Sequence, residues 1–152
     1  METTNRISEE IDTRISLIND LVVKREHDRA ISECSIVIEQ ARYNNMYEKE
    51  MAAHNLLGTL YRGKGDYQEA LNQFESAIVI AKEHGLEKSE ENAAAYFNAG
   101  ILLYNANPPL PQVVTLLEKA ISIRSSITDD ENDATLSDYK SILETFRRVY
   151  NL

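Results

Sequence analysis

The chain has 152 residues with only five glycines and three prolines, which is the size of one domain with little material for linkers. Its net charge of −9 argues against the clustered positive charge on which non-specific nucleic-acid binding and docking on anionic membranes depend. A single cysteine leaves no intrachain disulfide, and the N-terminus lacks the layout of a signal peptide. We therefore expect one cytoplasmic domain over residues 1–152, with no nucleic-acid or membrane partner.

In chain order, the first predicted element is an amphipathic helix. Apolar residues recur every three or four positions from residue 7 to residue 22, which is the spacing of one helical face. We expect this helix to begin between residues 5 and 8. A polar run ends that face, and a second apolar helical face follows over about residues 28–43. Cys34 lies among the apolar residues of the second face, which predicts a buried, structural thiol.

The stretch over residues 54–81 has the clearest pattern, two apolar helical faces joined by a glycine-bearing turn. Its large and small residues follow the order Leu57, Gly58, Tyr61, Ala70, Phe74 and Ala77. The pattern recurs 40 residues earlier, where Ile18 takes the place of Gly58, and 42 residues later, where Gly100 does. Three helix pairs are therefore predicted, near residues 8–44, 47–84 and 90–127.

A last helix is predicted near residues 134–150, after an acidic segment. Its apolar residues form one continuous stripe of Leu136, Tyr139, Leu143, Phe146 and Tyr150. The stripe has two interpretations. It caps the third helix pair, whose outer apolar face would otherwise meet water, or it forms the contact of a homodimer.

The order of large and small residues in the central stretch resembles the tetratricopeptide (TPR) repeat, whose pattern is L-G-x2-Y followed by A-x3-F. The spacing of about 40 residues exceeds the usual ~34 of that repeat, so the resemblance is to longer-period members of the superfamily. It implies an all-α fold, a right-handed superhelix of three TPR-like helix-turn-helix repeats with a C-terminal capping helix. It also implies binding rather than catalysis.

Residues that could carry chemistry are scattered. The three histidines, His27, His54 and His84, lie one to a helical region, and neither an H-E-x-x-H pair nor a cysteine pair is present. The segment 63–65, Gly-Lys-Gly, has neither a preceding strand nor a following G-K-[ST], so it does not match a phosphate-binding loop. We expect no catalytic residues, no metal and no cofactor.

The resemblance also suggests where a partner binds, because TPR proteins expose one stripe of each first helix on the concave side of the superhelix. The repeat offsets carry this stripe onto all three units. The expected binding groove consists of Ile15, Asn19, Asn55, Thr59, Arg62, Phe97, Asn98, Ile101, Tyr104 and Asn105. Its carboxamides offer both donors and an acceptor to a peptide backbone, and its apolar side chains select the partner's side chains. The alternative is a mainly structural groove with partners on the convex face.

These patterns together predict a non-catalytic scaffold or adaptor that binds a peptide or helix of a partner protein in the concave groove. Two alternatives stay open at this point. One is a small TPR chaperone, similar to those that serve secretion systems. The other is a structural module that homodimerises through its C-terminal helix.

Overall fold

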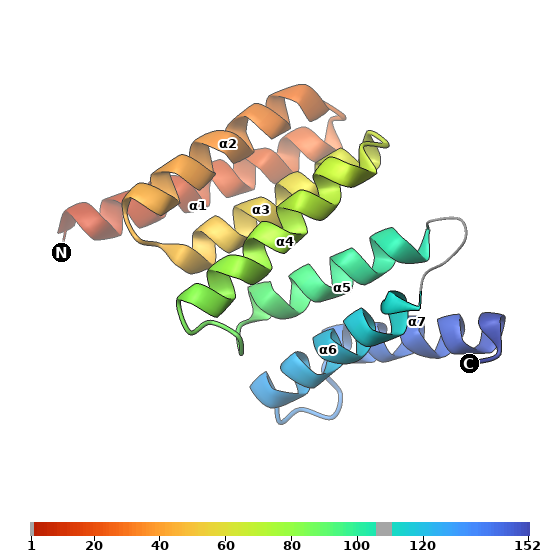
Figure 1. Ribbon diagram of the computed structural model, residues 1–152. Helices are drawn as coiled ribbons and strands as arrows, with labels where there is room; N and C mark the ends of the chain where they lie inside the picture. The colour runs from red at the N-terminus through yellow and green to blue at the C-terminus, as the bar shows by residue number, and fades with distance from the viewer. Residues whose placement is uncertain (1, 106–110) are drawn as a thin grey trace.

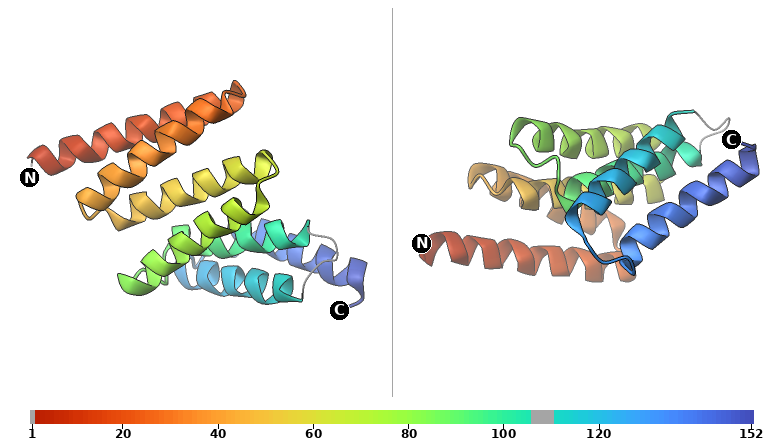
Figure 2. Two further views of the ribbon diagram at one scale, coloured as in Figure 1. Left: turned by 45° about the horizontal axis from the view of Figure 1, so that its top comes forward. Right: turned by 90° about the horizontal axis from the view of Figure 1, so that it is seen from below.

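The computed structural model describes residues 2–105 and 111–152, and these residues form seven α-helices and no strand. The helices are α1 (Glu2–Val23), α2 (His27–Tyr43), α3 (Tyr47–Gly63), α4 (Tyr67–Glu83), α5 (Glu90–Tyr104), α6 (Gln112–Ile127) and α7 (Ala134–Tyr150). Consecutive helices pack on one another, so that α1 with α2, α3 with α4 and α5 with α6 form three successive pairs (Figure 1). The termini lie at opposite ends of this row (Figure 2). The predicted all-α class is confirmed, and residues 106–110 of the third predicted pair lie outside the described residues.

The first helix begins at Glu2, earlier than the predicted start between residues 5 and 8. The segment from residue 2 to residue 6 has no apolar side chain, so hydrophobic periodicity carries no signal there. An ion pair between Arg6 and Glu10 (3.2 Å), one helical turn apart, supports the added turn.

The first four helices end with the same turn. The residues in the left-handed conformation are Arg25 (φ 61°), Asn45 (φ 56°), Gly65 (φ 82°) and Gly85 (φ 68°). In each turn the following backbone N–H donates to the carbonyl five residues back, for example Asp66 to Tyr61 at 2.9 Å. This is the Schellman ending of a helix. Because these turns fall 20 residues apart, each pair spans 40 residues, which accounts for the 40-residue repeat of the sequence.

Arg25 is the least suitable of these four residues for its backbone conformation, since its Cβ crowds the neighbouring carbonyl when φ is positive. We expect Arg25→Gly to raise the free energy of unfolding by about 0.5–1 kcal/mol. Asn45→Gly should change it less, because asparagine tolerates the left-handed conformation. Urea unfolding followed by circular dichroism measures both, and a destabilised Arg25→Gly variant would contradict the turn described here.

Small residues decide how closely the helices of a pair approach. A Cβ on Gly58 of α3 would lie 2.5 Å from Cε1 of Phe74 in α4, so only glycine fits against this fully buried ring. In the first pair the sizes are exchanged, with Ile18 in place of the glycine and the smaller Cys34 in place of the phenylalanine, both in one buried cluster. Burial raises the pKa of Cys34 to about 12. The prediction of a buried, structural thiol is therefore confirmed.

The last helix caps the third pair, as the first interpretation of its apolar stripe predicts. Four of the five stripe residues are buried, namely Leu136, Tyr139, Leu143 and Phe146. The ring of Tyr139 stacks on Phe97 of α5 with 4.1 Å between centroids. Phe146 meets Tyr104 of α5 edge-on at 5.3 Å and shares a cluster with Val113 and Leu117 of α6. The apolar faces of α5 and α6 are thereby covered within the chain.

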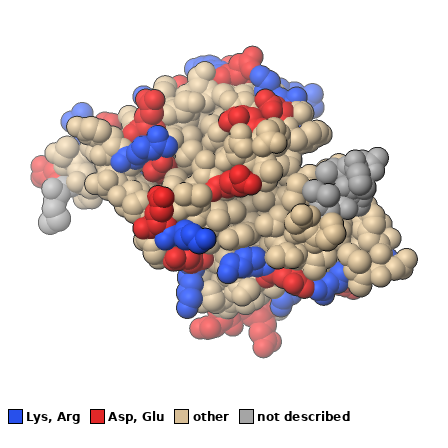
Figure 3. All heavy atoms as spheres, viewed as in Figure 1, with Lys and Arg blue, Asp and Glu red and all other residues tan. Residues whose placement is uncertain are grey.

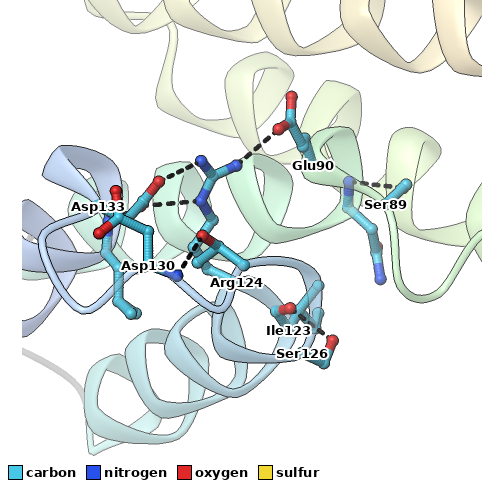
Figure 4. Close-up of polar contacts among 10 residues, drawn as sticks. Ser89, Glu90, Ile123, Arg124, Ser126, Asp130 and Asp133 are labelled. Atoms are coloured by element: carbon cyan, nitrogen blue, oxygen red, sulfur yellow. Dashed lines mark hydrogen bonds and ion pairs between the residues drawn. The ribbon is translucent and has the colours of Figure 1, made fainter.

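An arginine ties the start of α5 and the start of α7 to the end of α6 (Figure 4). The Arg124 guanidinium donates to both carboxylate oxygens of Asp133 (3.1 and 2.7 Å) and to Glu90 (2.8 Å). Asp133 is also the N-cap of α7, because its Oδ1 accepts from the backbone N–H of Leu136 at 2.7 Å. The guanidinium holds the pKa of the Asp133 carboxyl below its ordinary value. This network fixes the angle at which the capping helix leaves α6.

Candidate functional site

The first helices of the three pairs lie side by side and form one surface, here called the inner face. Helices α3 and α5 pack on each other directly, and α1 is joined to α3 by an ion pair between Asp12 and Lys49. The sequence places the expected binding stripe on this face. The structure shows which of its ten members are open.

The third unit's aromatic members are covered. Phe97 and Tyr104 pack against α7, so their rings support the cap instead of lining an open groove. Asn98 and Ile101 of α5 are half-buried. Asn105 is exposed at the end of that helix, and its Nδ2 donates to the carbonyl of Ile101 at 3.0 Å.

The asparagine of the middle unit is not an open groove residue either. Asn55 is 8% exposed, and its Nδ2 donates to the backbone carbonyl of Glu91 at 3.0 Å, which joins α3 to α5. Thr59 is exposed, and its hydroxyl donates to the carbonyl of Asn55 at 3.0 Å. Arg62 is half-buried. Asn55 therefore holds two neighbouring pairs together.

The first unit is the most open part of the inner face. Asn19 is exposed, whereas Ile15 is half-buried and packs against the first core cluster. Ile15 also lines a cavity of about 540 Å³ between α1 and the N-terminal ends of α3 and α5. This volume falls in the range of about 300–1,000 Å³ that is usual for ligand pockets.

The cavity, here called the inner cavity, has an apolar floor and a charged rim. The apolar side chains are those of Ile15, Met46, Ala52 and Leu86, and the charged ones are those of Asp12, Glu48, Lys49 and Glu91. Met46 and Leu86 belong to the connections between helices, which an argument based on helix faces alone does not reach. Their signal in the sequence is the position directly after the left-handed turn residue, because each Schellman ending aims the next residue back at the helices.

One carboxylate of the rim is partly withdrawn from solvent. Glu91 is half-buried in the first turn of α5, and burial raises the pKa of its carboxyl. The neighbouring carboxylates of Glu48 and Glu90 raise that pKa further. The rim of the inner cavity is therefore a place where negative charge is crowded.

A second cavity, of about 550 Å³, lies on the other side of an aromatic stack. The rings of Tyr47 and His84 are parallel within 10°, with centroids 3.5 Å apart, and both line the two cavities. The second cavity is bounded by residues of α2, α3 and α4, among them Arg42, Glu50 and His54. Arg42 Nε donates to the buried Glu50 carboxylate at 2.9 Å.

His54 is a buried, titratable group beside this second cavity. Its Nδ1 lies 2.7 Å from Oε1 of Gln73, and its Nε2, which has no hydrogen-bond partner among the described residues, lies 3.8 Å from Glu50 Oε1. Burial lowers the pKa of His54 below 6.5, although Gln73 and Glu50 act in the opposite direction and Arg42 adds to the lowering. The imidazole is neutral in the folded protein at pH 7.

The lowered pKa of His54 predicts a pH dependence of stability. Below about pH 6.5 the unfolded chain takes up a proton that the folded chain binds less readily, so stability is lost as the pH falls from 7 towards 5. We expect His54→Asn to make that loss shallower, because the variant cannot be protonated there. Urea unfolding at several pH values measures the slope, with His27→Asn as the control. Equal slopes in the wild type and His54→Asn would contradict the prediction.

The described residues hold neither a cluster of metal ligands nor a helix that could span a membrane. Within residues 2–105 and 111–152, no three His, Cys, Asp or Glu side chains are grouped so that they could hold a metal ion. None of the helices in those ranges has the length and apolar character that crossing a membrane requires.

Comparison with known proteins identifies the fold. No protein-family model matches the chain, and no curated protein matches it. Among solved structures, BtubC (BKLC) from P. vanneervenii is 20% identical with a TM-score of 0.74, over 89% of this chain and 54% of that one. The TPR domain of Arabidopsis FLU is 20% identical with a TM-score of 0.58, over 91% of this chain and 98% of that one.

The paired helices, their shared turns and these matches define a helical-repeat protein. Its fold is TPR-like, as the resemblance in the sequence implies. The chain spans about half the length of the BtubC structure that it matches.

Proposed function

We propose that this chain is a protein-interaction scaffold that holds a peptide or a short helix of a partner protein at the inner cavity. The observation that carries this proposal is the inner cavity itself, an apolar floor with a polar rim on the surface that TPR-like folds use for binding. A partner side chain that enters the cavity would cover Ile15 and Ala52, which the helices alone leave half-buried.

The predicted groove residues divide into two groups under this proposal. Ile15 lies in the inner cavity, and Asn19, Thr59, Arg62, Asn98, Ile101 and Asn105 extend the contact along the inner face. Asn55, Phe97 and Tyr104 support the surface from below, because their side chains are engaged within the chain. The partner contact is thereby moved towards α1 and α3 and away from the capped third unit.

The homodimer alternative has less support. Four residues of the stripe in α7 are buried against α5 and α6, so a dimer through that stripe would first have to expose them. Burying a leucine or phenylalanine side chain contributes about 1.5–3 kcal/mol each, so their exposure is costly. The proposal also assigns no catalytic step, and the chain's role is to bind.

The test blocks the inner cavity. Ala52 lies on its floor, and Ala52→Arg would fill it with a long charged side chain. Ile36→Arg on the exposed side of α2 is the matched control, with the same added charge outside the cavity. With each variant as bait in cells of the native host, we expect Ala52→Arg to lose at least about tenfold of the captured partner and the control to keep it. Equal capture by both variants, with unchanged circular dichroism, would overturn the proposal.

A further inference from the structure

We infer that the partner segment in the inner cavity is basic, with lysine or arginine side chains beside an apolar anchor. This inference rests on the proposed function and adds the chemistry of the partner to it. Three features of the cavity carry it: unbalanced charge on the rim, partial burial of one of the rim carboxylates and an apolar floor directly beneath them.

The charges on the rim do not cancel. It carries three carboxylates, those of Asp12, Glu48 and Glu91, and one ammonium group, that of Lys49. Lys49 is already engaged, because its Nζ donates to the carboxylate of Asp12. Among residues 2–105 and 111–152, neither Glu48 nor Glu91 forms an ion pair with a Lys, Arg or His side chain. Two carboxylates of the rim are left for an outside cation.

The opposite surface, formed by α2, α4 and α6, carries charges of both signs. Acidic and basic side chains are interspersed on the face that Figure 3 shows. Some of the charges on the second helices are already paired, as in the contact of Asp28 at the start of α2 with Lys64 (2.8 Å). A basic segment would meet both attraction and repulsion there, whereas the rim of the inner cavity offers it carboxylates.

Partial burial makes Glu91 the more responsive of the two free carboxylates. Glu91 is half-buried and next to like charges, whereas a fully solvated carboxylate is screened by water and salt. Glu48 and Glu91 lie in the first turns of α3 and α5, where the helix dipoles offset part of the negative charge. The dipoles explain why the chain tolerates the two carboxylates, but they supply no hydrogen-bonding cation. A guanidinium or ammonium group would supply one.

The floor of the cavity selects the rest of the partner segment. Ile15, Met46 and Leu86 form an apolar surface beneath the carboxylates. A basic side chain places its methylene stem on such a surface while its charged end reaches the rim. An adjacent apolar residue of the partner would fill the remaining space. A segment that alternates apolar and basic residues therefore fits both parts of the cavity.

The test uses three fluorescein-labelled synthetic twelve-residue peptides. They share the same leucines and differ only in the residues between them, which are lysine, glutamate or serine. Fluorescence anisotropy measures their affinities for the full chain. We expect the lysine peptide to bind about tenfold or more tightly than the serine peptide, and the glutamate peptide not to bind.

A charge-matched pair of double variants separates local from long-range attraction. Glu48→Gln with Glu91→Gln removes the two carboxylates of the inner cavity, and Glu75→Gln with Glu83→Gln removes two exposed ones beside the second cavity. We expect the first pair to weaken the lysine peptide about five- to tenfold and the second pair less than about twofold. Equal weakening by the two pairs, or no lysine-peptide binding at all, would overturn the inference.

The outcomes also distinguish this inference from the proposed function. If the serine and lysine peptides bind equally and Ala52→Arg blocks both, the inner cavity is a binding site and only the basic partner is wrong. If Ala52→Arg weakens none of the peptides and also captures its cellular partner normally, the proposed function itself is wrong.

Discussion

Gly58→Ala is expected to lower the free energy of unfolding by about 2–3 kcal/mol, although it adds a single methyl group. The new Cβ would lie 2.5, 2.8 and 2.9 Å from three atoms of the Phe74 ring. That ring is fully buried in a cluster with Ala70, Ala99 and Leu102, so it cannot swing aside as a flexible side chain would. Helices α3 and α4 would have to move apart. Urea unfolding followed by circular dichroism measures the change.

The other helical glycines provide matched controls for this prediction. A Cβ on Gly63 meets nothing within 4 Å, so Gly63→Ala should stabilise the chain by about 0.4–1 kcal/mol by restricting the unfolded backbone. A Cβ on Gly100 would lie 3.0 Å from Cδ2 of Leu117, a side chain that can shift, so Gly100→Ala should fall between the two. Gly58→Ala as stable as the wild type would contradict the packing described for the central pair.

Phe146→Ala is expected to have the second large effect, a loss of about 3–5 kcal/mol. The ring is 2% exposed and packs on Tyr104, Val113 and Leu117, so its removal leaves a cavity between α7 and the third pair. The loosened cap would expose the aromatic side chains of α5. We therefore expect increased binding of a hydrophobic dye as well as a lower unfolding midpoint.

Val149→Ala is the control for Phe146→Ala on the same helix. Its side chain is 54% exposed, so the substitution should change the free energy of unfolding by less than about 0.5 kcal/mol. If Phe146→Ala were equally mild, α7 would not be the cap of the third pair. Sedimentation of both variants would then show whether the stripe instead holds two chains together.

The fold could be predicted from the sequence because the repeat is written in local size patterns. Gly58 and Phe74, at matching places of one repeat unit, indicate close helix packing, and Gly65 and Gly85 mark two of the turns. Arg25 marks an equivalent turn without a suitable residue type, so only the 20-residue spacing from Asn45 identifies it. The predicted right-handed course of the superhelix stays a prediction, since it depends on small rotations between pairs.

The candidate site could be predicted only in part, because it depends on contacts between distant segments. Which stripe residues are covered is decided by where α7 lies, and the sequence of α5 does not show that Phe97 and Tyr104 meet it. Similarly, Asn55 has the composition of a binding residue but donates to a carbonyl 36 residues away. Met46 and Leu86 enter the cavity from connections that the helical stripe omits.

Amide hydrogen exchange of the chain, alone and in complex with its captured partner, would show directly which surface the partner covers. If the inner face is the binding surface, protection on binding should appear in α1 around Ile15 and in the first turns of α3 and α5. The exposed sides of α2 and α4 should exchange as before. Protection confined to α2, α4 and α6, with the inner cavity unchanged, would contradict binding at the inner face and place the partner on the opposite surface.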